Sequence, residues 1–217
     1  MIESASAAIV VTAQTFNPSI FTERWLDQNK IVETADFIGV RVFSPDLAQF
    51  QTPYLQVLIL PPKMQVIFDL NQQGTAEKPR ALVGKVVKLL PHTPYQALGL
   101  NFDYFVGAAT GLEFGDFNRR LFGCGPDPLS TEFGAPDARF GRYFSKQFGE
   151  ARLKLNVVPV HVPPDNRERM QLSFNFHHDL AAQDQPERVE KLIRSLEAWE
   201  RLKVCATELA AKVESVR

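Results

Sequence analysis

The sequence predicts an α+β fold: a mostly antiparallel sheet, with helices packed on one face and a long C-terminal helix. Three observations support this prediction. Segments in which apolar and polar residues alternate outnumber the helical segments, and they follow one another in groups with hairpin-like links. In addition, neither Gly nor Pro interrupts the chain from Glu187 to its end, which favours one long terminal helix.

In the first half, a β-branched run over residues 8–14 predicts the first strand. Asn17 and Pro18 then have the pattern of a helix cap and first turn. Pro61 and Pro62 separate two strand-like segments and predict a hairpin. The remaining expected elements are strands over 37–43, 54–60, 64–70 and 98–106 and a helix over 79–90.

In the second half, we expect a helix over 112–122 and a strand over 139–148. Alternation over 153–157 and 170–176 predicts two antiparallel neighbours around the loop 163–167. The final helix begins at Asp184, which has capping-box spacing to Glu187. Continued to residue 217, it would be on the order of 45 Å long, so part of it is expected to project or to meet a partner.

The chain has 217 residues, and we expect a single α+β domain over 1–217. The alternative is two halves: a ferredoxin-like βαββαβ unit over 1–106, and β-hairpins with the long helix over 107–217. The formal net charge is −1, so no field of the whole molecule would gather nucleic acid. Phe is abundant, with 17 copies, which favours packing over polar recognition.

The two cysteines, Cys124 and Cys205, have no metal-ligand spacing and are expected to be reduced thiols. Cys124 stands between two glycines, but no motif supports a nucleophile there. The N-terminus lacks the pattern of a signal peptide and no apolar run has the length of a membrane span, so we expect a cytoplasmic protein without membrane contact. The glycines match no phosphate-binding loop, so no cofactor is expected.

His177, His178 and Asp179 form the densest polar cluster, at the end of the predicted strand over 170–176. With His161 from the neighbouring strand, they are candidate ligand-binding residues, for a metal or for acid-base chemistry. Adjacent residues of a strand point to opposite faces, however, so His177 and His178 cannot easily share one ion. We therefore favour a strand end that runs into a helix cap, and we predict neither a catalytic residue nor a metal site.

A basic patch interleaved with aromatic residues is a second candidate site. Cations for phosphate beside rings for stacking are what single-stranded nucleic acid requires. A solvated strand face is the simpler interpretation, because the net charge is slightly negative and no RNA-binding motif is present. The cations of this patch are Arg139, Arg142, Lys146, Arg152 and Lys154.

The terminal helix carries apolar residues at heptad spacing, with charged residues between them. We interpret it as an interaction helix with Trp199, Leu202, Leu209 and Val213 on its apolar side. The run is too short to require a coiled coil, so packing on the protein's own sheet is an equal alternative.

These patterns favour a non-catalytic protein that acts by association, as a homo-oligomer or as a subunit of a larger assembly. A protein partner or self-association is therefore expected, without nucleic acid or membrane. One alternative is binding of a small apolar ligand in a cavity lined by Phe68, Phe102, Phe174 and Phe176; such an arrangement resembles the helix-grip fold in outline. The other is binding of single-stranded nucleic acid through the 139–154 patch.

Overall fold

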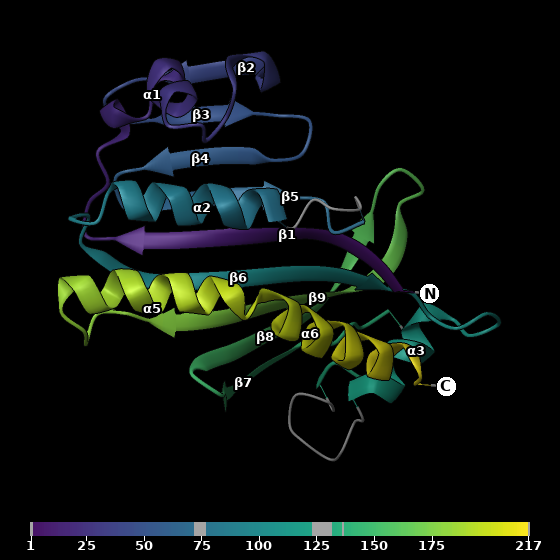
Figure 1. Cartoon of the computed structure of the whole chain (residues 1–217). Helices are drawn as coiled ribbons and strands as arrows, with labels where there is room; N and C mark the ends of the chain where they lie inside the picture. The colour runs from purple at the N-terminus through teal and green to yellow at the C-terminus, as the bar shows by residue number, and fades with distance from the viewer. Residues whose placement is uncertain (1, 72–76, 123–131, 136, 217) are drawn as a thin grey trace.

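The computed structural model describes residues 2–71, 77–122, 132–135 and 137–216, and the strands in these ranges form one nine-stranded sheet (Figure 1). All neighbouring strands run antiparallel, which confirms the predicted sheet type. The strands are β1 (Ile2–Ala13), β2 (Ile38–Phe43), β3 (Ala48–Gln51), β4 (Gln56–Leu60), β5 (Lys63–Phe68), β6 (Tyr95–Val106), β7 (Arg142–Phe148), β8 (Ala151–Val162) and β9 (Arg167–Asp179).

The strands follow the order β2-β3-β4-β5-β1-β6-β9-β8-β7 across the sheet. In the first half, β6, β1, β5 and β4 have the order of a split βαβ unit, and β3 and β2 extend it to one edge. In the second half, β9 pairs with β6 from Asp179 opposite Ala97 to Met170 opposite Val106. The strands from residues 1–106 and those from residues 107–217 therefore belong to one continuous sheet.

Both predicted hairpins are confirmed. β4 and β5 close around Pro61 and Pro62, and β8 and β9 pair up to Val162 opposite Arg167. The strand β3 was not predicted from the sequence, and it is only four residues long. β1 begins at Ile2, six residues before the predicted start at residue 8. β1 gains these additional residues because it pairs with β6 as far as Ile2 opposite Val106.

Three helices, α2 (Glu77–Leu89), α5 (Gln185–Glu197) and α6 (Trp199–Glu214), lie in front of the sheet in Figure 1 and contact β1, β5, β6 and β9. α2 buries the apolar stripe that its sequence predicts, including Leu82, Val83 and Val86. The helix expected after Asn17 is shorter than predicted: Asn17 caps only a 3-10 turn. The other described helices are η1 (Pro18–Ile20), α1 (Glu23–Gln28), η2 (Thr34–Asp36) and α3 (Phe114–Phe122).

The prediction of one continuous terminal helix is wrong. Asp184 does cap α5, with its carboxylate accepting a hydrogen bond from the Glu187 amide at 3.0 Å, but α5 ends at Ala198 and α6 begins there. A straight helix cannot follow a twisted sheet over this length. The break lets α6 stay on the sheet and bury Trp199 and Leu202, so this part of the helix does not project.

The central core is filled by aromatic rings. The Trp199 ring lies 4.5 Å from that of Phe102 and 5.3 Å from that of Phe68, between centroids. Phe102 in turn packs edge-on against Phe176 at 5.9 Å. The expected ligand cavity lined by Phe68, Phe102, Phe174 and Phe176 is therefore wrong: all four are at most 4% exposed, and Trp199 occupies the space that a ligand would need.

Candidate functional site

The histidine cluster is divided between the two faces of the sheet. We call the face on which Trp199 packs the helix face; it carries Phe102 and Phe176. His178 follows Phe176 by two residues, lies on the helix face and is only 3% exposed, whereas His177 lies on the opposite face and is partly exposed. The two imidazoles therefore do not face a shared cleft.

The other members of the cluster are also separated. His161 pairs with Glu168 in the β8–β9 ladder, nine residues along β9 from His177, which corresponds to roughly 30 Å. The carboxylate of Asp179 accepts a hydrogen bond from the Ala181 amide at 2.8 Å and so caps the turn after β9. Within the described ranges, no three His, Cys, Asp or Glu side chains come together in a way that could hold a metal ion.

The basic patch is likewise split. Arg142 and Lys146 lie on the helix face of β7. Arg152 and Lys154 lie on the opposite face of β8, as the ladders with β7 and β9 show. The four cations therefore cannot line one track for a single nucleic-acid strand. Cys124, the other candidate from the sequence, falls outside the described residues.

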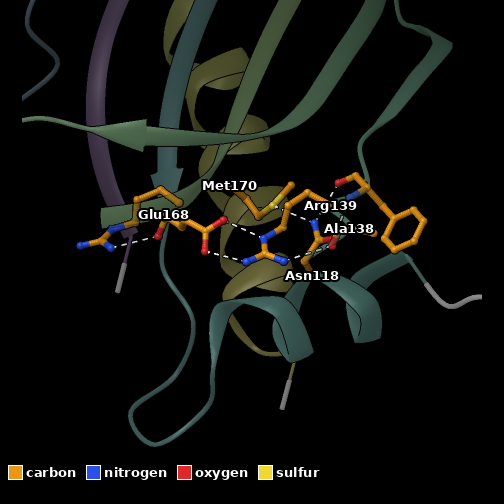
Figure 2. A network of polar contacts seen from close by, with 7 residues as sticks. Asn118, Ala138, Arg139, Glu168 and Met170 are labelled. Atoms are coloured by element: carbon orange, nitrogen blue, oxygen red, sulfur yellow. Dashed lines mark hydrogen bonds and ion pairs between the residues drawn. The ribbon is translucent and has the colours of Figure 1, made fainter. Parts of the chain in front are cut away.

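Arg139, the fifth cation of the patch, forms a two-point ion pair with Glu168 (Figure 2). Its Nε donates to Oε1 at 2.7 Å and its Nη2 donates to Oε2 at 2.9 Å. These hydrogen bonds hold the pKa of the Glu168 carboxyl below its usual value, although partial burial acts against them. Arg139 therefore ties the segment before β7 to β9.

A buried amide strengthens the same connection (Figure 2). Asn118 of α3 is fully buried; its Nδ2 donates to the Phe140 carbonyl and its Oδ1 accepts from the Phe140 amide, both at 2.8 Å. Arg142 adds a hydrogen bond to the carbonyl of Phe122 at 2.7 Å. Together these contacts fix α3 beside the start of β7.

An apolar groove of about 530 Å³ lies where α3, β7, β8 and α6 meet. α6 packs on β1, β6 and β9. Beside it most side chains of β7 are exposed, whereas Leu153 and Val157 on the helix face of β8 are buried. The outward ring of Phe144 is 47% exposed. The groove is lined by Leu121, Phe122, Phe144, Ser145, Lys146, Leu153, Leu155, Val157, Leu209, Lys212 and Val213.

The spacing of apolar residues in the sequence explains which side chains form the floor and one wall of the groove. The alternation of β8 places Leu153, Leu155 and Val157 together on the helix face, where they form the floor. Helical spacing places Leu209 and Val213 on one side of α6, where they form a wall. These two, predicted as part of an interaction helix, line the groove, whereas Trp199 and Leu202 from the same prediction are buried in the core.

Two lysines are among the residues that line this apolar surface, Lys146 on β7 and Lys212 on α6. Across the residues that the structure describes, neither has a carboxylate within ion-pair distance. The partly buried thiol of Cys205 lies near both: burial raises its pKa, while the charges of Lys146 and Lys212 lower it and that of Glu208 raises it. The groove thus combines an apolar interior with cations on two of its walls.

No protein-family model matches the chain, and no curated protein matches its sequence. Among the described helices, none is both long enough and apolar enough to cross a membrane.

Proposed function

We propose that this protein binds an elongated apolar small molecule in the groove beside α6. The observation that carries the proposal is the groove itself: about 530 Å³, with eight apolar residues among the eleven that line it. This volume falls within the range of roughly 300–1,000 Å³ that is typical of small-molecule sites. It lies on β7 and β8 beside α6, and β8 is the neighbour of β9, which carries Phe174 and Phe176 of the cavity that the sequence suggested.

The rigidity of the walls supports this proposal. The floor belongs to a strand paired on both sides, since β8 lies between β9 and β7. One end is formed by α3, which Asn118 and Arg142 tie to the β7 segment. Removing the half-exposed apolar surface of Phe144 and Val213 from water would favour binding.

A neutral apolar dye tests the proposal. Nile red should gain fluorescence with the wild-type protein, and Val213→Trp, which fills the groove from α6, should weaken its binding at least tenfold. The matched control is Val204→Trp, because Val204 is 55% exposed on the same helix and does not line the groove. Equal dye binding by both variants and the wild type, or no binding by any of them, would contradict the proposal.

A second candidate function is self-association through β2, and the exposure of that edge strand favours it. β2 is the last strand at one edge of the sheet, and its pairing with β3 is irregular between Ile38 and Val42. Ile38, Val40 and Val42 have 40%, 84% and 38% of their surface exposed. An exposed apolar edge strand is a template for pairing with another chain. Two copies joined by antiparallel β2 strands would form one continuous sheet with twofold symmetry.

Sedimentation velocity across a wide range of protein concentrations tests this second candidate. If β2 mediates association, Val40→Lys should shift the protein to a monomer, while Val204→Lys on α6 should leave the distribution unchanged. A wild-type protein that is monomeric throughout would exclude it.

A further inference from the structure

We infer that the groove selects a single-chain carboxylate, such as a fatty acid, with the tail along Leu155 and Val213 and the carboxylate between Lys146 and Lys212. This inference rests on the proposed function, because it names the class of ligand that the groove would take. It adds a charged anchor to a site whose remaining lining is apolar apart from Ser145.

The two cations approach the groove from different elements. Lys146 comes from the edge strand β7 and Lys212 from the last turn of α6, and both border the same cavity. The charges of both lysines also act on the thiol of Cys205, which is on α6. A carboxylate held between them would receive charge-assisted hydrogen bonds from two directions.

The local balance of charge favours an anion. Glu208 is the one acidic group whose charge acts on the Cys205 thiol, against the two lysines. Arg142, near the Phe122 end of the groove, donates to the Phe122 carbonyl and lies over the ring of that residue, so its guanidinium is already engaged. The Lys146 ammonium lies 6.0 Å from the centre of the Phe148 ring. Among the described residues, neither Lys146 nor Lys212 donates a hydrogen bond from its ammonium group.

The tail is expected to contribute most of the affinity. Each methylene group buried in an apolar site strengthens binding about fourfold. Dodecanoate should therefore bind about fifteenfold more tightly than decanoate. The two lysines are exposed, and an exposed ion pair contributes up to about fivefold, so the carboxylate should add about tenfold in total.

Competition with Nile red separates the two contributions. Dodecanoate should displace the dye from the wild-type protein at about one tenth of the concentration that dodecanol requires, and added salt should reduce only the dodecanoate affinity. In the double variant Lys146→Gln, Lys212→Gln the two ligands should bind equally, with dodecanol unchanged. Lys154→Gln is the matched control, because Lys154 lies on the other face of the same hairpin.

The outcomes distinguish the inferred carboxylate anchor from the proposed binding of an apolar molecule in the groove. Equal binding of dodecanoate and dodecanol by the wild-type protein, or a preference that persists in the double variant, would overturn the carboxylate anchor and leave the apolar groove in place. Absence of binding by the dye and by both ligands would overturn the groove as well. A dimer that dissociates in Val213→Trp, without ligand binding by the wild type, would show that a second copy occupies the groove and would also overturn the inference.

Discussion

The side chain of Asn118 forms two reciprocal hydrogen bonds with the backbone of Phe140, each 2.8 Å long. The amide thereby pairs with Phe140 as a neighbouring strand would, although Asn118 belongs to a helix. A third contact, from Nδ2 to the sulfur of Met170 at 3.4 Å, links the same amide to β9. One buried residue thus joins three segments at the end of the groove.

Replacing Asn118 is expected to destabilise the fold and to weaken ligand binding. Asn118→Ala would leave the amide and the carbonyl of Phe140 unpaired in a partly buried position, at a cost of about 1–3 kcal/mol in the free energy of unfolding. Urea unfolding measures the stability and Nile red titration measures the groove. Asn156→Ala is the control, because Asn156 is exposed on the opposite face of β8 and should change stability by less than about 0.5 kcal/mol. A stable Asn118→Ala variant would show that the amide is dispensable.

His178 is expected to make stability depend on pH. Burial lowers its pKa from 6.5 to about 4, and the charge of Lys191 adds to the shift while that of Glu150 opposes it. The unfolded chain therefore binds a proton between pH 6.5 and 4 that the folded chain does not, so the free energy of unfolding falls as the pH is lowered through this window. A shift of this size corresponds to about 3 kcal/mol.

Urea unfolding at several pH values between 7.5 and 4.5 measures this effect. His178→Leu should remove most of the pH dependence, and it should stabilise the protein at pH 5, because both ring nitrogens of His178 are buried without a hydrogen-bond partner among the described residues. The exposed-histidine variant His161→Gln should retain the wild-type dependence. Identical pH profiles for His178→Leu and the wild type would refute this assignment.

The core and the groove are expected to respond differently to aromatic truncation. Trp199→Ala should cost about 3–5 kcal/mol, because it leaves a cavity beside Phe68 and Phe102. Phe144→Ala should cost less than about 1 kcal/mol, since 47% of that residue is exposed, but it should weaken binding in the groove severalfold. Thermal unfolding and dye titration of both variants test this separation. If Phe144→Ala binds the dye with unchanged affinity, Phe144 of β7 does not contribute to the binding site.

The ion pair of Arg139 and Glu168 is expected to contribute a modest coupling energy. Both side chains are about one quarter exposed, so a double-mutant cycle with Arg139→Met and Glu168→Gln should give roughly 1 kcal/mol at neutral pH. The pKa of Glu168 is lowered in the folded protein, so this contribution is present above the unfolded carboxyl value of 4.5 and is lost as the pH falls below it. A cycle with no coupling at neutral pH would mean that the contact does not stabilise the β7 segment.

Local patterns were reliable wherever one face of an element is buried. The alternation in residues 170–176 identified β9, and it correctly separated His177 from His178. The stripe of α2 and the hairpin at Pro61 and Pro62 were equally clear. Two groove residues were predicted to have other roles: Lys146 as part of a basic patch, and Val213 as part of an interaction helix.

Contacts between segments that are distant in the sequence determine the features that local patterns did not predict. Asn118 carried no signal in the sequence, because its partner Phe140 is 22 residues away. The helix breaks at Ala198, next to Trp199, which packs on Phe68 and Phe102. The apolar spacing within the helix gives no information about these contacts with distant strands.

By itself, the sequence determined the antiparallel strands, the faces they bury and most of the helices, because hydrophobic periodicity acts over a few residues. Only the tertiary structure decided which strands are neighbours, where the terminal helix bends and that an apolar groove with two lysines opens beside it. The reason is physical: the floor of the groove on β8 and its wall on α6 meet only when the whole sheet has assembled and α6 has packed across it.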